Sequence, residues 1–290
     1  MKMIRKHLDK NHVLYDNQDL IDLVGPIDQV SRYHMVQYER DYDVFLIEGP
    51  RGSVIYKTTE SENEVKVLRH LAEGGYPGIP DLYRVFQKEG AYDLIMAYVD
   101  GQDREPSLET YKEVLDHLSQ IHLSDRDQGT IRRWSPLPLE ELQLLQGDLD
   151  VQGLVTSQRD LDKSYKTLIH GDLIPLNIIH KDHGSYIIDW EYGEYSPIIR
   201  DISRLLGDIN VNRKWVDPAY EEDLLDYYYD LIKDKSQMSR KDFDRLYLAG
   251  KIDNYLGPLL SFKLRKREPD AWYRINLEAA KACLDSYKEM

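Results

Sequence analysis

Two neighbouring polar motifs in the second half of the chain restrict its possible folds more than any other feature. Residues 169–177 read IHGDLIPLN, and residues 186–191 read YIIDWE. Asp172, Asn177 and Asp189 therefore lie at the edges of short apolar runs that are typical of β-strands. One carboxylate, one amide and a second carboxylate on a loop and a hairpin suit a divalent metal site beside an activated hydroxyl group.

The residue types in these motifs indicate separate roles. Asp172, if held near an acceptor hydroxyl, can orient that hydroxyl and accept its proton. Magnesium prefers oxygen ligands and leaves positions for phosphate oxygens and water, which fits Asp189 and the amide oxygen of Asn177. We expect His170 to hold the loop through hydrogen bonds to the backbone, and Gly171 to permit a tight turn before Asp172.

The motif His-Gly-Asp-x-x-x-x-Asn followed by Ile-Asp-Trp-Glu resembles the aminoglycoside phosphotransferase and choline kinase superfamily, which consists of small-molecule kinases with a protein-kinase-like fold. Protein kinases have a related loop with Arg before the Asp and Phe-Gly after the metal-binding Asp. Here Gly171 and Trp190-Glu191 stand in those places, and no Ala-Pro-Glu tripeptide follows. The resemblance therefore favours the small-molecule branch over a protein kinase.

This resemblance implies an α+β, two-lobed, protein-kinase-like fold. Residues 1–98 would form an N-terminal nucleotide-binding lobe, with an antiparallel sheet, one main helix and an N-terminal extension. Residues 99–290 would form a larger, mostly helical C-terminal lobe for catalysis and substrate binding. By the same resemblance, the cofactor would be Mg²⁺ and the phosphate donor would be ATP or GTP.

The region upstream contains strand and helix patterns in the order that such a fold requires. Residues 43–48 and 53–57 are rich in Val, Ile, Phe and Tyr, and they predict two strands. The Gly-Pro-Arg-Gly segment 49–52 joins these strands, and we interpret it as a hairpin turn. A helix is predicted next, because apolar residues recur at helical spacing after a possible N-cap at Ser61.

Lys57 ends the second of these strands, and Glu64 lies one turn into the helix. In kinase-like folds a strand lysine contacts the α and β phosphates and is oriented by a helix glutamate. The resemblance therefore assigns these roles to Lys57 and Glu64. Glu62 remains a competitor for the glutamate role.

Residues 92–101 predict a buried strand that ends in a turn. In the resembled family this strand leads into a hinge whose backbone pairs with adenine, which assigns the base contacts to Ala97 and Val99. The family's nucleotide-covering loop would lie at residues 38–42, which contain no glycine and are acidic. Arg40 in this segment can partly replace the missing backbone groups that bind phosphate.

A further acidic residue follows the second motif at a turn marked by Pro197. In the resembled family an Asp at the position of Asp201 supports the catalytic loop through hydrogen bonds. We assign that supporting role to Asp201. The alternative is a helix N-cap, and one residue can do both.

Several carboxylates are candidates for substrate contact. They are Glu191, Asp217, Glu221 and Glu222. Carboxylates bind amino groups, and the aromatic run 227–229 can cage a quaternary ammonium group. The alternative is that the acidic residues stabilise the first turn of a helix.

Composition excludes several classes of protein. The formal net charge of −14 argues against non-specific nucleic-acid binding, which requires Lys and Arg. The same charge favours a cationic small-molecule partner. The alternative is that the charge only keeps the protein soluble. The sequence has no run of about 18 apolar residues, so it does not indicate a membrane span. Residues 1–10 lack the apolar segment of a signal peptide, and Cys283 is the single cysteine, so we expect a cytoplasmic location without disulfides.

These observations predict an ATP- or GTP-dependent phosphotransferase that moves the γ-phosphate to a hydroxyl of a small cationic molecule. The acceptor would be aminoglycoside-like or choline- and amino-alcohol-like. The alternative is a kinase-like structural or regulatory protein, for example of the spore-coat type, with weak or no catalysis. Residues 211–290 contain no motif that names the acceptor.

Overall fold

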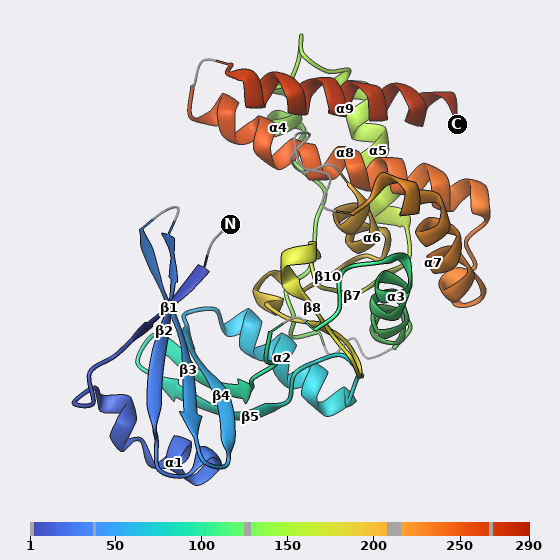
Figure 1. Ribbon diagram of the computed structural model, residues 1–290. Helices are drawn as coiled ribbons and strands as arrows, with labels where there is room; N and C mark the ends of the chain where they lie inside the picture. The colour runs from blue at the N-terminus through green and yellow to red at the C-terminus, as the bar shows by residue number, and fades with distance from the viewer. Residues whose placement is uncertain (1–2, 37–38, 102, 125–128, 208–215, 267–268) are drawn as a thin grey trace. The chain divides into compact units, whose positions relative to one another are not determined.

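The computed structural model describes residues 3–36, 39–101, 103–124, 129–207, 216–266 and 269–290 (Figure 1). The chain divides into two compact units. The first comprises Met1–Asp103 together with Tyr186–Glu191, and the second comprises Arg104–Ser185 together with Tyr192–Met290. The short segment that carries Asp189 therefore belongs to the first unit, although most of its sequence neighbours belong to the second.

A single antiparallel sheet forms most of the first unit. Its neighbouring strands follow the order β1-β2-β3-β4-β6-β5. The strands are β1 (Met3–His7), β2 (Gln29–Met35), β3 (Arg40–Gly49), β4 (Gly52–Thr59), β5 (Leu82–Lys88) and β6 (Ala91–Ala97). The expected N-terminal antiparallel sheet is confirmed, and the two strands predicted at 43–48 and 53–57 are longer than expected.

The predicted hairpin between β3 and β4 is present, because Gly49 pairs with Gly52 across the turn. Helix α1 (Gln18–Val24) lies so close that a Cβ at Gly49 would be 2.5 Å from the carbonyl oxygen of Val24. Val54 and Tyr56 on β4 are buried in the core that α1 covers. Because side chains alternate along a strand, Lys57 projects from the opposite face of the sheet.

Helix α2 (Glu62–Gly74) follows β4, and Ser61 is its N-cap as predicted. The hydroxyl oxygen of Ser61 accepts a hydrogen bond from the Glu64 backbone N–H at 3.1 Å. The apolar stripe of α2 is buried, including Val65 and Leu71. The cap and the stripe together fix the rotation of the helix, and they therefore fix the direction of the Glu64 side chain.

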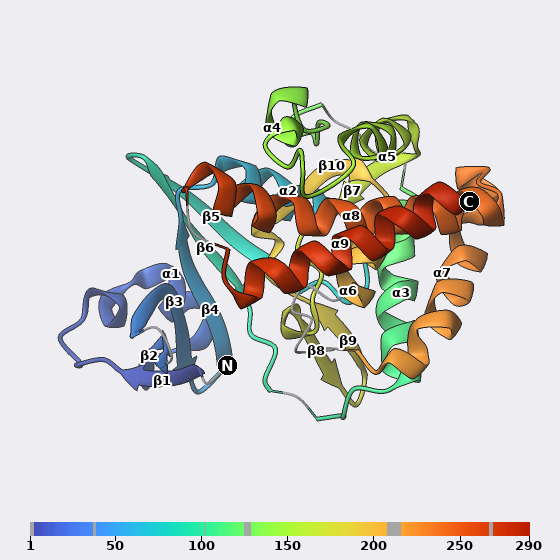
Figure 2. The same ribbon diagram turned by 90° about the horizontal axis from the view of Figure 1, so that it is seen from above.

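The second unit consists mainly of helices. They are α3 (Leu108–His122), α4 (Leu139–Gln143), α5 (Val151–Lys163), α6 (Ile199–Leu206), α7 (Glu221–Ser236), α8 (Arg240–Leu264) and α9 (Ala271–Glu289). Helices α8 and α9 pack along one another (Figures 1 and 2), and α6 packs against α8. The predicted helical character of this region is confirmed.

Short strands carry the two polar motifs. Strand β7 (Lys166–Ile169) pairs with β10 (Glu194–Pro197), and β8 (Ile178–Lys181) pairs with β9 (Gly184–Ile187). The first motif lies directly after β7, and the second lies at the end of β9. Within the described ranges, no helix combines the length and the apolar character that crossing a membrane requires.

Candidate active site

Lys57 is the centre of a charge cluster in the first unit. Its Nζ donates to Glu64 Oε1 at 2.6 Å and lies 3.3 Å from Asp189 Oδ1. The side chain of Lys57 is 15% exposed and that of Glu64 is 2% exposed, whereas that of Asp189 is 47% exposed. The structure thus brings together the strand lysine, the helix glutamate and the second-motif carboxylate that the sequence singled out.

The electrostatics of this cluster keep the lysine charged. Burial by itself lowers the pKa of Lys57, but the negative charges of Glu64, Asp189 and Glu191 outweigh it and raise the pKa above its ordinary value. Lys57 is therefore an ammonium ion at neutral pH, which is the form that binds phosphate oxygens. Glu191 contributes to this field, a role that differs from the substrate contact expected from the sequence.

Glu62, the competitor for the glutamate role, lies elsewhere. It forms an ion pair with Lys66 at 3.0 Å, and its side chain is 64% exposed. Glu64, in contrast, is buried, and within the described part of the chain its Oε2 atom has no hydrogen-bond partner. The geometry therefore gives the contact with Lys57 to Glu64.

The turn that presents Asp189 has an unusual backbone. Asp189 has φ +63°, a left-handed conformation that residues other than glycine adopt infrequently. Trp190 anchors the turn, because its ring is buried and its Nε1 donates to the Ile187 carbonyl oxygen at 3.2 Å. Such strain persists where the surrounding structure holds it, and it is common at functional sites.

The first motif forms a tight loop after β7 in the second unit. Gly171 has φ +78°, and a Cβ there would lie 2.4 Å from the carbonyl oxygen of Tyr192, so no other residue fits without movement. His170 is buried, and its Nδ1 accepts the backbone N–H of Asp172 at 3.2 Å. Both residues therefore shape the loop that carries Asp172, in the way their residue types suggest.

Asp201 ties this loop to helix α6. Its Oδ2 accepts the His170 N–H at 2.7 Å, and its Oδ1 accepts the Gly171 N–H at 3.0 Å. Burial alone would raise the pKa of Asp201, but its hydrogen bond to His122 and the nearby imidazole of His170 hold that pKa below its ordinary value. The alternative interpretation of Asp201 as a helix N-cap is wrong, because Ile198 occupies the N-cap position of α6.

His122 extends this support into two further helices. It is fully buried at the end of α3, with Nε2 3.2 Å from Asp201 Oδ2 and Nδ1 hydrogen-bonded to the hydroxyl of Tyr228 on α7. The aromatic cage suggested for residues 227–229 does not form, because Tyr228 is fully buried and Tyr227 donates to Asp116 at 2.7 Å. Tyr228 instead supports the network behind the loop.

The amide group of Asn177 has a defined orientation. Its Nδ2 donates to the carbonyl oxygen of Asp172 at 2.9 Å, so the amide oxygen Oδ1 is the atom left to act as a ligand. Asn177 lies in the second unit and Asp189 in the first. Each residue, within its own unit, offers an oxygen atom, which is the donor type that Mg²⁺ prefers.

Arg204 is a site residue that the sequence reasoning missed. Its Nε and Nη2 both donate to one oxygen of the candidate base, Asp172 Oδ1, at 3.0 and 2.7 Å. A signal existed, because Arg204 follows Asp201 by three positions, a spacing that places two side chains on neighbouring parts of a helix surface. An arginine so close to the loop-supporting Asp201 was a candidate for contact with the same loop.

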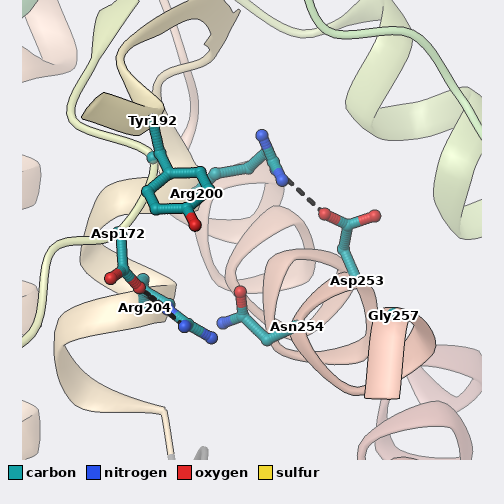
Figure 3. Close-up of a pocket in the computed structure, with 8 residues that line it drawn as sticks. Asp172, Tyr192, Arg200, Arg204, Asp253, Asn254 and Gly257 are labelled. Carbon is teal, nitrogen blue, oxygen red and sulfur yellow. Dashed lines mark hydrogen bonds and ion pairs between the residues drawn. The ribbon is translucent and has the colours of Figure 1, made fainter. Parts of the chain in front are cut away.

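A pocket of about 370 Å³ opens beside Asp172 in the second unit (Figure 3). Helix α8 supplies part of its wall, and no sequence motif indicated that helix. The lining residues are Gly171, Asp172, Tyr192, Arg200, Arg204, Asp253, Asn254 and Gly257. The pocket can hold a small molecule with a group adjacent to Asp172.

The charges of this lining are balanced. Arg200 Nε donates to Asp253 Oδ2 at 2.9 Å, and its Nη1 pairs with Glu194. Burial by itself lowers the pKa of Arg200, but Asp253 and Glu194 outweigh it and raise that pKa. With Arg204 paired to Asp172, every charged side chain of the lining has an opposite partner.

The three carboxylates predicted for substrate contact on α7 and just before it are not part of this pocket lining. Asp217 caps a short 3₁₀ helix by accepting the Ala219 N–H at 3.0 Å. Glu221 accepts the hydroxyl of Tyr247 at 2.8 Å. Glu221 and Glu222 lie in the first turn of α7, as the helix-stabilising alternative predicts.

The expected base-binding segment follows β6. The Ala97 N–H already donates to the Asp81 carbonyl oxygen at 2.8 Å, so a contact of Ala97 with a base would have to use its carbonyl oxygen. Val99 lies just beyond the strand. In the expected nucleotide loop, Tyr38 lies outside the described residues, and Arg40 begins β3 with its guanidinium 5.3 Å from the ring of Tyr42.

Residues 37–239 match the phosphotransferase enzyme family. This match covers most of the chain, and it includes Lys57, Glu64, Asp172, Asn177 and Asp189. The chain belongs to the phosphotransferase enzyme family. The superfamily that the sequence resembles is thereby confirmed.

One curated relative of this phosphotransferase is the Protein LicA homolog of Mycoplasma capricolum subsp. capricolum. It is 24% identical over 157 residues, which are 52% of this chain and 62% of the relative, so the match leaves more than a third of the relative uncovered.

Two solved structures share the fold of this phosphotransferase. Amicoumacin kinase hAmiN, in complex with AMP-PNP, Ca²⁺ and Ami, has a TM-score of 0.59 at 13% identity, covering 88% of this chain and 86% of that one. The ethanolamine kinase of Plasmodium vivax has a TM-score of 0.57 at 14% identity, and the match covers 97% of this chain and 87% of that one. The expected kinase-like α+β fold is thus confirmed.

Proposed function

We propose that this phosphotransferase moves the γ-phosphoryl group of ATP or GTP to a hydroxyl of a small molecule. The observation that carries the proposal is Asp172, whose carboxylate is held by Arg204 at the wall of a pocket of about 370 Å³. A carboxylate in this setting can align an acceptor hydroxyl. The family match supports the reaction class.

On the nucleotide side, Lys57 would bind phosphate oxygens, and Glu64 would orient it through the 2.6 Å ion pair. Glu64 is buried and Lys57 is mostly covered, so the ammonium group has little freedom to leave its position. The backbone of Val99 and the carbonyl oxygen of Ala97 would contact the base. Arg40 would add positive charge near the nucleotide.

On the acceptor side, the hydroxyl would donate its hydrogen bond to Asp172. The hydroxyl oxygen forms a bond to the γ-phosphorus while the bond from that phosphorus to the β–γ bridging oxygen breaks. Asp172 takes the proton, and the nucleoside diphosphate leaves. His170, Gly171 and Asp201 fix the loop, so that the carboxylate does not move during transfer.

Asp189 and the amide oxygen of Asn177 would hold the magnesium ion. When bound, Mg²⁺ neutralises charge on the phosphate oxygens. The hydrogen bond from Asn177 to the Asp172 carbonyl fixes which amide atom is available. The exposure of the Asp189 carboxylate leaves it accessible to a metal–nucleotide complex.

The acceptor would be small and cationic, aminoglycoside-like or amino-alcohol-like. The net charge of −14 supports this proposal, because an acidic protein attracts cations over distance. A cytoplasmic setting, where ATP and GTP are available, fits the single cysteine.

Calorimetric titration with ATP and GTP, each with and without Mg²⁺, tests the donor side. Phosphate transfer should then be measured across aminoglycosides, choline, ethanolamine and a peptide mixture. We expect magnesium-dependent binding and transfer to a small molecule. Absence of nucleotide binding would favour a structural or regulatory role, and transfer to peptides alone would contradict the small-molecule assignment.

A further inference from the structure

The ion pair between Arg204 and Asp172 is asymmetric. An arginine fork commonly binds both oxygens of a carboxylate. Here Nε and Nη2 both donate to Oδ1, at 3.0 and 2.7 Å. Within the described part of the chain, Asp172 Oδ2 and Arg204 Nη1 have no hydrogen-bond partner. One acceptor atom and one donor group therefore remain on the same ion pair.

The rest of the pocket lining does not favour a cation beside the reacting hydroxyl. Asp253 uses both oxygens internally, because Oδ2 binds Arg200 and Oδ1 accepts from Gln158 at 2.8 Å. Tyr192 is the single aromatic residue of the lining, and one ring does not form a cage for a quaternary ammonium. The attraction of the whole protein for cations therefore does not extend to this position.

The groups that remain are suited to oxygen atoms. Asn254 uses its Nδ2 to donate to the Ser203 carbonyl at 2.9 Å, which leaves its Oδ1 as an acceptor. Figure 3 shows the side chains of Arg204 and Asn254 extending toward one another. Donors and acceptors thus occur together next to Asp172, a pattern that fits hydroxyl groups on neighbouring carbons.

We propose that Arg204 positions Asp172 and also recognises the oxygen next to the reacting hydroxyl, so that the acceptor carries a vicinal diol. This inference rests on the proposed function. The reacting hydroxyl donates to Asp172 Oδ2, and the neighbouring oxygen accepts from Arg204 Nη1. The bonds made and broken are those of the phosphoryl transfer described above, and Arg204 exchanges no proton.

The test compares acceptors that differ by that one oxygen. We would use trans-1,2-cyclohexanediol and cyclohexanol, with choline as a cation that has a single hydroxyl. Binding is measured by saturation-transfer NMR, and transfer by nucleoside diphosphate release with Mg²⁺ and ATP or GTP. We expect the wild-type protein to favour the diol over cyclohexanol by about tenfold in affinity and in kcat/KM, the effect of one charged hydrogen bond.

Three variants separate positioning from general loss of an ion pair. Arg204→Met should abolish the preference for the diol, and it should also lower kcat for every acceptor, because Asp172 is no longer held. Arg204→Lys keeps the charge without the fork and should restore part of kcat but little of the preference. Arg245→Met removes another arginine–aspartate pair, 3.0 Å to Asp160, and should leave the preference unchanged.

The outcomes distinguish this inference from the proposed function. The inference would be overturned if the two cyclohexane compounds bound equally or undetectably. It would also be overturned if the protein preferred choline, or if the preference for the diol survived in Arg204→Met. Binding of the diol that depends on Arg204, without any phosphate transfer, would support the recognition and contradict the proposed function. Transfer to choline alone would support the function and overturn the inference.

Discussion

Lys57 and Asp189 lie 132 positions apart in the sequence, yet their charged groups are 3.3 Å apart in the first unit. The contact exists because the segment 186–191 belongs to that unit and not to the one that surrounds it in sequence. Glu64 completes the cluster from α2 at 2.6 Å. The cation that we propose to bind phosphate thus lies beside the carboxylate that we propose as a metal ligand.

The ion pair between Lys57 and the buried Glu64 gives a first prediction. Glu64→Gln should lower the free energy of unfolding by about 3 kcal/mol, because a buried charge loses one partner, although Asp189 still neutralises part of it. It should also weaken nucleotide binding, since Lys57 is less firmly oriented. Urea unfolding and nucleotide titration measure both effects. Glu62→Gln is the matched control, and its exposed pair predicts a change below about 0.5 kcal/mol. Equal effects would contradict this account.

The close approach at Gly171 gives a second prediction. Gly171→Ala should destabilise the protein by more than about 2 kcal/mol and remove most activity, because the new Cβ would lie 2.4 Å from a carbonyl oxygen. Gly90→Ala is the control, since Gly90 has a similar φ of +74° with nothing within 4 Å. Gly90→Ala should cost about 1 kcal/mol through backbone strain alone. Thermal unfolding measures the stability of both variants. An equal loss of stability in Gly171→Ala and Gly90→Ala would contradict the role of the close approach.

Two glycines of α8, of which only Gly257 lines the pocket, predict effects of different size. A Cβ at Gly257 meets nothing within 4 Å, whereas one at Gly250 would lie 2.3 Å from Ser203 Oγ. Gly257→Ala should therefore change stability by less than about 1 kcal/mol, because only the ring of the following Pro258 crowds the new Cβ, whereas Gly250→Ala should destabilise the protein more strongly. Gly257→Leu should fill the pocket, raise KM for the acceptor at least about tenfold and leave nucleotide affinity unchanged. An unaltered acceptor KM would show that the acceptor binds elsewhere.

Asp201 predicts a dependence of stability on pH. Its pKa is lower in the folded protein than the ordinary value of 3.8, so the unfolded chain binds a proton first as the pH falls. Its stabilisation is therefore complete above about pH 5 and is lost as the pH falls through the folded pKa. Asp201→Asn should lower stability at neutral pH and reduce the slope of unfolding free energy against pH below about pH 4. An unchanged slope in chemical unfolding would contradict this prediction.

The sequence predicted the parts of the molecule that depend on local pattern. The β3–β4 hairpin and helix α2 follow from strand composition, a glycine-rich turn and the N-cap Ser61, which are all local signals. Asp172 is a candidate site residue because of a motif with fixed spacing, and Lys57 is one because it ends a predicted strand that precedes a helix in the order of the resembled family. Such signals identify residues without showing their partners.

The sequence did not predict the residues that distant packing brings together. Asp253, Asn254 and Gly257 reach the pocket because α8 packs against α6, and their own segment has no motif. The acidic first turn of α7 had two physical interpretations, and the sequence alone offered no means to choose between them. His122 and Tyr228 join Asp201 across the core of the second unit, a contact that only the fold defines.

The central claim is a division of labour between Asp172 and Asp189, and a paired measurement tests it most directly. Magnesium–nucleotide affinity and turnover should be determined for Asp172→Asn and Asp189→Asn. We predict that Asp172→Asn lowers kcat by about 10²–10⁴-fold with nearly unchanged nucleotide affinity. Asp189→Asn should instead weaken magnesium-dependent nucleotide binding by at least about tenfold. Equal loss of nucleotide binding in both variants would contradict the account.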